Sequence, residues 1–494
     1  MNMRYVLSVD QSTQGTKALL FDQAGRLLHR SDLTHQQVID AHGWVSHDLE
    51  EIYQNLIRCV QAVVQQAGIR KSDIVCLGIS NQRETAAAWN RETGKPICGA
   101  VVWQCSRSNA ICERIATAAS TKQIQRRTGI PLSPYFPASK FTWIRENVAE
   151  AALLAQQHAL CLGTVDTWLI YRLTQGASYK TDYSNASRTQ LFNISTLQWD
   201  PDICRMFGLE PAELATVCDS DSVFGFTDLE GFLPAPIPIC GVLGDSHGAL
   251  FGQGCLRSGE LKVTYGTGSS VMMNIGSTPK YSMHGLVTSL AWRRNGQTQY
   301  VMEGNINYTG AVITWLQELG LIASPPESEQ LARQAHAADT TYLVPAFTGL
   351  GAPYWDGEAQ AALYGLTRQT GRAEIVKAGL ESIAYQISDV LRTIEQDIGI
   401  PVREVLADGG ATKNAYLMQF QSDISGTPVH VTDAEELSGI GAAYMAGLSF
   451  GIYDPSVFSI IQRTPYTPQM DDQTRLAKHA GWEDAVRRTL RRQA

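Results

Sequence analysis

Tyr5-Val-Leu-Ser-Val-Asp10 begins the pattern that decides the fold of this chain. It is an apolar run that ends in an aspartate, and it leads into the polar turn Gln11-Ser-Thr-Gln-Gly-Thr16 and a second apolar run, Lys17-Ala-Leu-Leu-Phe-Asp22. Two apolar runs around a turn of hydroxyl side chains and one glycine are typical of a β-hairpin.

The same plan returns in the second half of the chain. Leu261-Lys-Val-Thr-Tyr265 leads into Gly266-Thr-Gly-Ser-Ser270 and then Val271-Met-Met-Asn-Ile275. Two such hairpins at the heads of two halves of similar length predict a duplicated architecture. Turns rich in N–H groups and hydroxyls can hold phosphate oxygens. Two ordinary hairpin turns would give the same pattern, so both interpretations stay open on these residues alone.

Strand and helix patterns alternate between and after the two hairpins, which predicts an α/β fold with mixed or parallel sheets. We expect a domain boundary in the glycine-rich segment 251–259, and therefore an N-terminal domain over residues 1–252 and a C-terminal domain over 253–494. The expected elements are a helix over Glu50–Gln66, a strand over Ile74–Ile79, a helix over Glu374–Gly399, a strand over Glu404–Asp408, a tight turn at 409–411 and a helix that begins near Asn414.

Composition and charge exclude several classes of function. The 494 residues are 44% hydrophobic and 18% charged, with a formal net charge of −8 and no long Lys/Arg run, so nucleic acid is not expected as a partner. No stretch is apolar enough to span a bilayer, and the first residues lack the apolar region of a signal peptide. The ten cysteines show no Cys-x-x-Cys spacing, which indicates reduced thiols in a cytoplasmic protein.

Two common nucleotide-binding motifs are absent from the sequence. There is no Gly-x-x-x-x-Gly-Lys-Ser/Thr loop and no Gly-x-Gly-x-x-Gly fingerprint, so P-loop and Rossmann binding are unsupported. Any phosphate-binding turn in this chain must be of another kind.

A series of ordered motifs gives a specific family resemblance. Tyr135-Phe-Pro-Ala-Ser-Lys140-Phe-Thr-Trp143-Ile-Arg-Glu-Asn147 fits the first signature of the FGGY carbohydrate kinases, and the segment 361–381 fits the second apart from Gly379. Further blocks resemble the glycerol kinases of that family: Asn81-Gln-Arg-Glu-Thr85, Val102-Trp-Gln-Cys105, Gly163-Thr-Val-Asp-Thr-Trp168, Phe347-Thr-Gly-Leu-Gly-Ala-Pro-Tyr-Trp-Asp356 and Met418-Gln-Phe-Gln-Ser-Asp423.

The resemblance covers nearly the whole chain and implies a fold and an activity. The expected fold is two actin-like (ribonuclease H-like) ATPase domains that flank a catalytic cleft. The expected activity is transfer of a phosphoryl group from ATP, with Mg²⁺, to a hydroxyl of a small polyol or sugar. Domain closure on the substrate is expected, because water in the site would hydrolyse ATP. Family analogy also implies a homo-oligomer, either a dimer or a tetramer.

Two aspartates carry the expected chemistry. Asp245, in Gly244-Asp245-Ser246-His247, matches the catalytic aspartate of the family, which accepts the proton of the acceptor hydroxyl. By itself, an aspartate at the start of a helical pattern is more often a helix cap. Asp10 matches a ligand of Mg²⁺, to which Asp245 is also expected to contribute, although an aspartate there can simply begin a turn.

The remaining site residues are carried over from the resemblance, position by position. The acceptor pocket is expected to use Arg83, Glu84, Trp103, Tyr135 and Asp245, with Ser246 and Ser270 beside them. Arginine and glutamate can donate to and accept from neighbouring hydroxyls, and the aromatic faces suit a carbon skeleton. The ATP site is expected to use Thr13, Thr16, Lys17, Thr267, Gly268, Gly310, Gly410, Ala411 and Asn414.

Four positions depart from the glycerol kinase pattern. Ser246 and His247 stand where glutamine is usual, Ser270 stands where phenylalanine is usual, and Lys17 replaces the usual arginine. Smaller, more polar side chains should widen the acceptor pocket, so we expect an acceptor larger than glycerol, such as a tetritol, pentitol or ketose.

Three alternatives remain on the sequence alone. The chain can be a true glycerol kinase, a non-catalytic ATP- and sugar-binding sensor on the same fold, or a transferase that uses another phosphoryl donor.

Overall fold

The first large sheet contains the predicted N-terminal hairpin. The computed structural model describes residues 3–491, and its first sheet has the strand order β14-β15-β6-β1-β2-β3. β1 pairs antiparallel with β2 and parallel with β6, which itself pairs parallel with β15. The strands are β1 Tyr5–Gln11, β2 Gly15–Phe21, β3 Leu27–Thr34, β6 Ile74–Asn81, β14 Gly225–Thr227 and β15 Ile237–Gly244.

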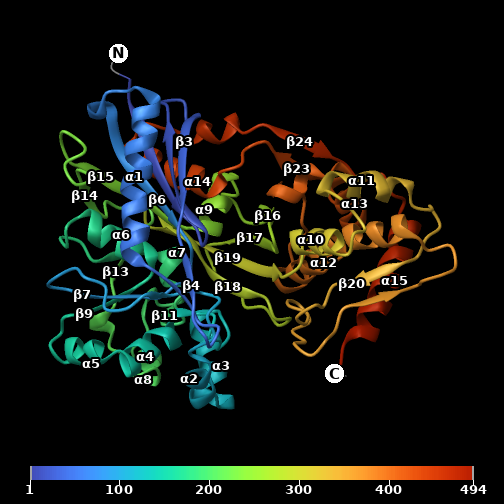
Figure 1. Cartoon of the computed structure of the whole chain (residues 1–494), viewed down its shortest axis with the longest axis horizontal. Helices are drawn as coiled ribbons and strands as arrows, with labels where there is room; N and C mark the ends of the chain where they lie inside the picture. Colours follow the sequence, from blue (N-terminus) through green and yellow to red (C-terminus); the bar gives the residue numbers. More distant parts are fainter. Residues whose placement is uncertain (1–2, 492–494) are drawn as a thin grey trace.

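The second large sheet repeats this local plan, as the two sequence hairpins predicted. Its order is β18-β19-β17-β16-β22-β23-β24, and β16 pairs antiparallel with β17 and parallel with β22, just as β1 does with β2 and β6. The strands are β16 Leu261–Tyr265, β17 Ser269–Gly276, β18 Val287–Arg294, β19 Gln297–Ile306, β22 Val405–Asp408, β23 Val429–Thr432 and β24 Arg463–Tyr466. In Figure 1, β16 to β19 lie in the middle of the molecule, between the two halves.

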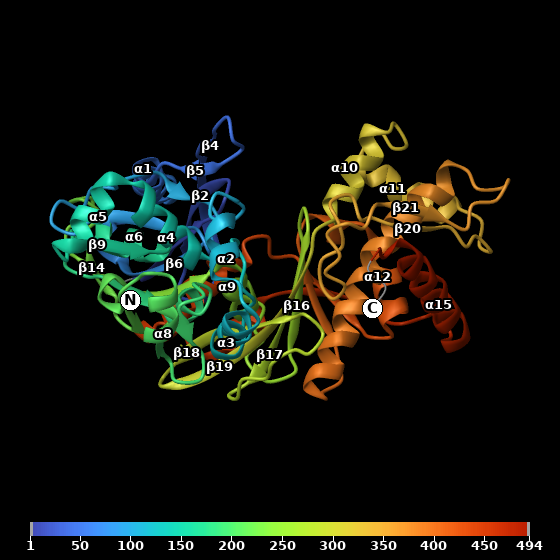
Figure 2. The ribbon, with the colours of Figure 1, turned by 90° about the horizontal axis from the view of Figure 1, so that it is seen from below.

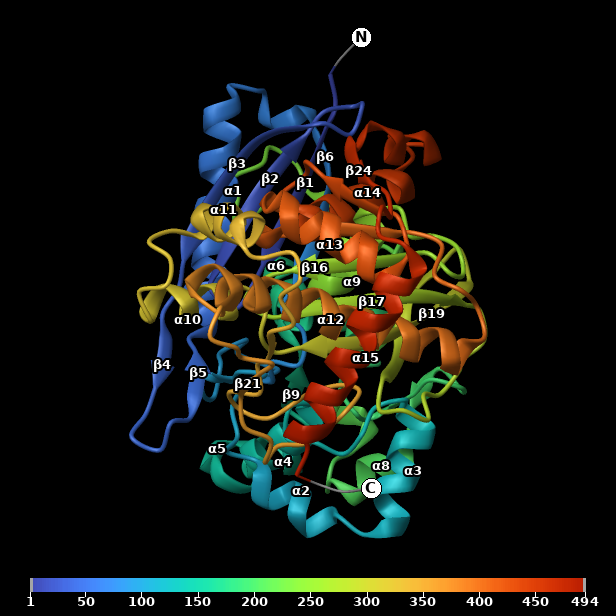
Figure 3. The same ribbon diagram turned by 90° about the vertical axis from the view of Figure 1, so that its right-hand side faces the viewer.

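The two long predicted helices are confirmed. α1 covers Leu49–Ala67, and Asp48 caps it by accepting hydrogen bonds from the backbone N–H groups of its first turn. α12 covers Arg372–Ile398 and its apolar residues enter the core of the second half. The outer helix α15, Asp472–Thr489, lies against α12 (Figure 3). The ring of Trp482 on α15 stacks on that of Tyr385 on α12 at a centroid distance of 5.1 Å.

One helix of the second half packs on the first sheet. α14, Leu437–Phe450, approaches both β6 of this sheet and the neighbouring helix α9, Asp245–Gly252, so closely that glycines are required at the contacts. A Cβ atom added at Gly441 would lie 1.9 Å from the carbonyl oxygen of Gly248, and one at Gly78 would lie 2.4 Å from that of Ala442. Figures 1 and 2 show the two halves side by side, with the N-terminal half on the left. The proposed division at residue 252 separates the two sheets, but α14 crosses it.

The remaining elements surround these layers. The other helices are α2 Asn109–Ile115, α3 Ala118–Thr128, α4 Pro137–Asn147, α5 Ala149–Gln156, α6 Val165–Leu173, α7 Tyr183–Ala186, α8 Pro201–Met206, α9 Asp245–Gly252, α10 Gly310–Glu318, α11 Pro325–Gln334 and α13 Ala415–Ser425. The other strands are β4 Gln37–Ile39, β5 Val45–His47, β7 Ala87–Asn90, β8 Ala100–Val101, β9 Leu160–Gly163, β10 Lys180–Asp182, β11 Phe192–Asn193, β12 Gln198–Trp199, β13 Thr216–Cys218, β20 Tyr342–Val344 and β21 Ala362–Tyr364. All ten cysteines are free thiols, and within residues 3–491 no helix combines the length and apolarity needed to cross a bilayer.

Candidate active site

Three parallel strands bring the predicted catalytic residues to one edge of the first sheet. Asp10 lies at the end of β1, Arg83 follows the end of β6, and Asp245 follows the end of β15. The carboxyl ends of neighbouring parallel strands meet at the same edge, which is where open α/β sheets bind their ligands. The sheet therefore assembles groups that are far apart in the sequence.

Asp245 is the first residue of α9 and does not occupy its cap position. Gly244 takes that position, so the interpretation of Asp245 as a helix cap is wrong. The Asp245 carboxylate accepts a hydrogen bond from the Ser246 N–H at 2.6 Å, and its Oδ1 lies 3.0 Å from Nε of Arg83. The side chain is 33% exposed. A carboxylate that is held on one side and open on the other can receive a proton from a bound hydroxyl.

Asp10 is buried and one of its carboxylate oxygens is left without a partner. Oδ1 makes no hydrogen bond. Burial raises the pKa of this carboxyl to about 7, an effect that Lys17 opposes and Asp245 reinforces. A cation beside Asp10 would relieve this cost. Mg²⁺ is commonly held by one or two carboxylates together with waters and phosphate oxygens, so Asp10 and Asp245 fit a magnesium site.

The predicted acceptor residues Trp103 and Tyr135 lie against each other. Their ring centroids are 5.5 Å apart with the planes tilted by 57°. The Trp103 indole N–H donates to Oγ1 of Thr13 at 2.9 Å, which joins the aromatic pair to the turn between β1 and β2. Burial raises the pKa of the Tyr135 phenol, so this side chain stays neutral. The aromatic wall and the first hairpin turn therefore form one connected unit.

Glu84 has an unusual backbone that a buried lysine supports. Its φ of 61° lies in the left-handed region, which is strained for a residue with a side chain and is often found at functional sites. The ammonium of Lys140 donates to the Glu84 carbonyl oxygen at 3.5 Å and also to the carbonyl oxygen of Tyr135. The Glu84 carboxylate accepts from Nε of Arg188. Lys140 belongs to the first family signature, but nothing local in the sequence indicated that it would contact both acceptor residues.

Arg83 is almost fully buried, and residues from both halves of the chain occupy its donors. Its terminal nitrogens donate to Ser246 Oγ at 3.1 Å and to the two carboxylate oxygens of Glu303 at 3.1 and 3.2 Å. Sequence reasoning missed Glu303 and Arg188. Glu303 is 220 residues from Arg83 and stands in an ordinary strand pattern, so no sequence signal could have found it.

His247 and Ser270, two of the positions that depart from the glycerol kinase pattern, have different surroundings. His247 is fully buried, with Nε2 3.4 Å from Ser289 Oγ and Nδ1 unpartnered, so it does not widen an open pocket. Burial, reinforced by Arg83, lowers its pKa and keeps it neutral. Ser270 pairs with Asn305 on β19, which places its side chain on the same face of the sheet as Glu303. The Ser270 hydroxyl oxygen is buried without a hydrogen-bond partner.

Lys17 is already paired with a carboxylate. Its ammonium lies 2.6 Å from Oε2 of Glu436, the residue before α14, and the other oxygen of Glu436 pairs with Arg30. The Thr16 hydroxyl is buried and has no partner. The predicted contact of Lys17 with ATP therefore requires the lysine to leave Glu436 or to be shared with it.

The second hairpin turn lies beside the start of α10. The Gly310 N–H donates to the Gly266 carbonyl at 2.9 Å, and the Thr309 N–H donates to the Thr267 carbonyl at 3.0 Å. A Cβ atom at Gly268 would lie 2.3 Å from the Ile306 carbonyl oxygen, so only glycine fits there. Thr267, Gly268 and Gly310 are thus brought together as predicted.

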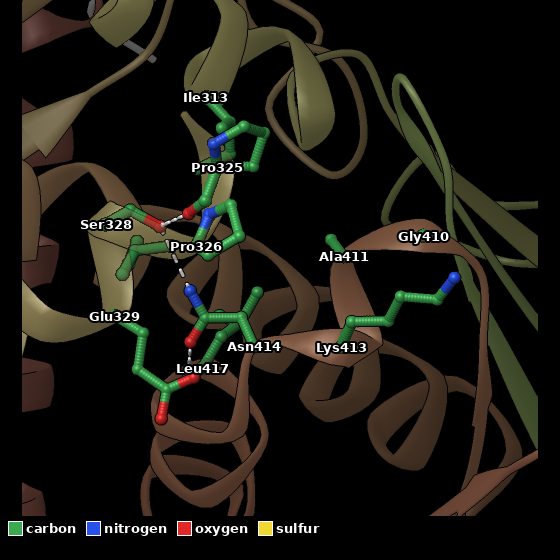
Figure 4. A pocket seen from close by; sticks show the side chains of 11 residues that line it. Ile313, Pro325, Pro326, Ser328, Glu329, Gly410, Ala411, Lys413, Asn414 and Leu417 are labelled. Atoms are coloured by element: carbon green, nitrogen blue, oxygen red, sulfur yellow. Dashed lines mark hydrogen bonds between the residues drawn. The ribbon is translucent and has the colours of Figure 1, made fainter. Parts of the chain in front are cut away.

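A cavity of about 210 Å³ collects the other predicted nucleotide residues (Figure 4). Gly410, Ala411 and Asn414 form one side, and Ile313 of α10 and Pro325 and Ser328 of α11 form the other. Asn414 caps α13 through Oδ1 and donates through Nδ2 to Ser328 Oγ at 3.1 Å. A second cavity of about 520 Å³ shares Gly410 and Lys413 with the first. An apolar slot with a few fixed polar groups suits a flat ring system, and the residues from α11 had no motif to reveal them.

The two sheets share one plan, Asp10 lies at the end of β1, Asp245 directly follows β15, and a cavity that suits a flat ring lies beside α10. This combination is typical of an actin-like kinase. Models of the FGGY family of carbohydrate kinases match residues 5–252 (N-terminal domain) and 261–450 (C-terminal domain). The chain belongs to this family and is a carbohydrate kinase.

Relatives of known name agree with this assignment. The chain is 46% identical over 490 residues to "Glycerol kinase 1" of Thermotoga maritima, covering 98% of this chain and 99% of the relative. It is 42% identical to "Glycerol kinase" of Caldanaerobacter subterraneus, covering 99% of each. Among solved structures, glycerol kinase of Plasmodium falciparum with ADP superposes with a TM-score of 0.94 at 36% identity, covering 99% of each chain. Xylulose kinase of Lactobacillus acidophilus, at 20% identity, covering 98% of this chain and 97% of that one, shares the fold with a TM-score of 0.88.

Proposed function

We propose that this kinase transfers the γ-phosphoryl group of ATP to a hydroxyl of a short polyol, with Asp245 as the general base. The observation that carries the proposal is the position of Asp245: partly open, in contact with Arg83, and at the same sheet edge as Asp10. A carboxylate in this position orients the acceptor hydroxyl and takes its proton as the phosphoryl group moves. General-base catalysis typically contributes about 10²–10⁴-fold to such a rate.

The same proposal gives the other predicted residues roles that agree with their positions. Arg83 and Glu84 would hold neighbouring acceptor hydroxyls, and the Trp103–Tyr135 pair would cover the carbon skeleton. The cavity beside Asn414 would take the nucleobase, and the two hairpin turns would face the phosphates. Asp10 and Asp245 would hold Mg²⁺, directly or through water, which when bound neutralises charge on the transferring phosphates.

The decisive experiment is an ADP-release assay with ATP, Mg²⁺ and one polyol at a time. The Asp245→Asn variant should lose at least a hundredfold in kcat while its affinity for ATP stays within a few-fold of the original. Asp219→Asn is the matched control, because Asp219 is also a partly exposed carboxylate that pairs with an arginine, Arg293, and it is not among the predicted site residues. Full activity of Asp245→Asn would refute the assigned base. ATP binding without acceptor-dependent turnover would favour the sensor alternative.

The names of the relatives favour glycerol as the acceptor, and the comparisons do not support the expected larger acceptor. One local observation still favours longer polyols as a second candidate: the buried Ser270 hydroxyl lacks a partner that an additional substrate hydroxyl could supply. A panel of C3 to C6 polyols and ketoses separates the two. A strong preference for glycerol over four- and five-carbon polyols would reject the larger acceptor.

A cytoplasmic location and a dimeric or tetrameric assembly are part of the same proposal.

A further inference from the structure

A buried ionic cluster joins the acceptor residues of the first half to a strand of the second. Its centre is Glu303 on β19, whose side chain is 0% exposed. Both of its oxygens accept hydrogen bonds from the terminal nitrogens of Arg83, and Oε2 also lies 3.0 Å from a terminal nitrogen of Arg188. Arg188 in turn donates through Nε to Glu84. Two of the predicted acceptor-binding side chains are therefore connected to Glu303: Arg83 directly, and Glu84 through Arg188.

Glu303 is charged in spite of its burial. Burial alone would raise the pKa of its carboxyl, but Arg83 and Arg188 together hold that pKa well below its usual range. The neighbouring His247 is neutral, because burial lowers the pKa of its imidazole well below the usual range. Removal of one partner from such a buried cluster is strongly destabilising, because it leaves the remaining charges uncompensated.

The geometry at Arg83 shows what this arrangement does. A carboxylate that takes both terminal nitrogens fixes the plane of a guanidinium group, which a single contact would not do. With the plane fixed, the Arg83 Nε is held 3.0 Å from Asp245 Oδ1, and one terminal nitrogen is held on Ser246. The orientation of the proposed base and of the proposed acceptor ligand thus depends on a carboxylate that comes from the other sheet.

The same chain segment continues from Glu303 into the nucleotide site. β19 ends at Ile306, and α10 begins at Gly310, whose N–H bonds to the second hairpin turn. Ile313 of α10 lines the cavity beside Asn414. Only six residues separate Glu303 from Gly310, and part of that interval is rigid strand. A displacement of this segment by a nucleotide would therefore move the carboxylate that holds Arg83.

We propose that Glu303 is a positioning residue for phosphoryl transfer: it fixes Arg83 for the acceptor and couples acceptor binding to the β19–α10 segment of the nucleotide site. This inference rests on the proposed kinase function but concerns a residue that contacts neither substrate. It predicts that bound acceptor changes the affinity for the nucleotide, and bound nucleotide the affinity for the acceptor, and that this coupling depends on the charge of Glu303.

Glu303→Gln tests this role because it keeps the shape and removes the charge. We expect the KM of the acceptor to rise roughly 10- to 100-fold, as for loss of a charge-assisted hydrogen bond, while the KM of ATP measured at saturating acceptor changes little. The affinity for a non-hydrolysable ATP analogue should differ with and without acceptor in the original protein. In Glu303→Gln the ratio of these two affinities, with and without acceptor, should approach one.

Glu213→Gln is the matched control. Glu213 is also buried and accepts from one nitrogen of Arg145 through both oxygens, at 2.9 Å each, away from the predicted site residues. It should lower thermal stability without changing the KM of the acceptor or the coupling ratio. If Glu303→Gln behaves like Glu213→Gln, Glu303 is only structural and the inference is overturned.

A further variant covers the case in which Glu303→Gln does not fold. Glu303→Asp keeps the charge and withdraws it by one methylene group, so a smaller rise in the acceptor KM is expected. An unchanged acceptor KM in a folded Glu303→Asp variant would also overturn the inference. If the original protein shows no acceptor-dependent turnover, the proposed function fails instead, and the two failures are distinguishable.

Discussion

Replacement of Lys140 by methionine should change how the stability of this protein depends on pH. Lys140 is fully buried on α4. Burial lowers the pKa of its ammonium from 10.5 to about 7, an effect opposed by Glu84, Cys105 and Cys112 and reinforced by Arg107. The folded protein therefore releases this proton near pH 7, whereas the unfolded chain keeps it until about pH 10.5.

The sign of the effect follows from proton binding. Between pH 7 and 10.5 the unfolded state binds one proton more than the folded state, so the free energy of unfolding rises with pH. The slope is about 1.4 kcal/mol per pH unit for one group. From pH 7 to pH 9.5 Lys140 should therefore add about 3 kcal/mol to the stability of the original protein, and methionine should add nothing. Below pH 7 both states hold the proton and the slope vanishes.

Thermal unfolding of both proteins between pH 6 and pH 9.5 measures this difference. For a domain of about 250 residues, such as the N-terminal half that contains Lys140, about 3 kcal/mol corresponds to roughly 6–12 °C in Tm. The difference in Tm between the original protein and Lys140→Met should change by this amount over the pH range. Lys377→Met is the control, because Lys377 is also buried but lies 3.7 Å from a partner, Asp339. A Tm gap between Lys140→Met and the original protein that stays constant over this pH range would refute the reasoning.

Activity should respond as well, because Lys140 supports the strained backbone of Glu84. The acceptor KM of Lys140→Met should rise about tenfold through loss of the bonds to the carbonyl oxygens of Glu84 and Tyr135, and kcat should change less. Lys140→Arg, which retains a donor, should recover part of this loss. Equal changes in both variants would contradict a role through these bonds.

Three further substitutions test other parts of the structure. Ser270→Phe should fill the space beside the unpartnered hydroxyl, and a panel of acceptors should show activity on four- and five-carbon polyols falling at least tenfold relative to glycerol. Glu436→Gln should release Lys17 from its 2.6 Å ion pair, and the KM of ATP should fall a few-fold in steady-state kinetics. Gly441→Ala should force a methyl group against the Gly248 carbonyl and lower stability by about 1–3 kcal/mol or more, measured as a fall in Tm.

Each of these variants has its own control or contrary result. An unchanged acceptor profile in Ser270→Phe would show that this position does not face the acceptor. Glu435→Gln removes an exposed neighbouring charge, and an equal effect on ATP would assign the change to general electrostatics rather than to Lys17. Gly357→Ala places a methyl group in open space, so a Tm as low as that of Gly441→Ala would contradict the packing argument.

The sequence by itself determined the two hairpins, the long helices and the residues at the ends of strands. Tyr5–Asp10 and Leu261–Tyr265 are local patterns, and local periodicity with turn chemistry is enough to predict such elements. Asp10, Arg83 and Asp245 were found because ordered motifs mark them. The packing of α14 on the first sheet was not predictable, because the glycines that permit it belong to segments more than 150 residues apart.

Only the tertiary structure decided which charges compensate one another. Glu303 reaches Arg83 from the other sheet, Glu436 takes up Lys17, and Lys140 holds the backbone of Glu84. Glu303, Glu436 and Lys140 are all buried, and a buried charged or polar group must find its partner wherever folding places one. Sequence patterns record the side chains that chemistry requires, whereas the distances that fix their orientation arise only when segments far apart in the sequence pack together.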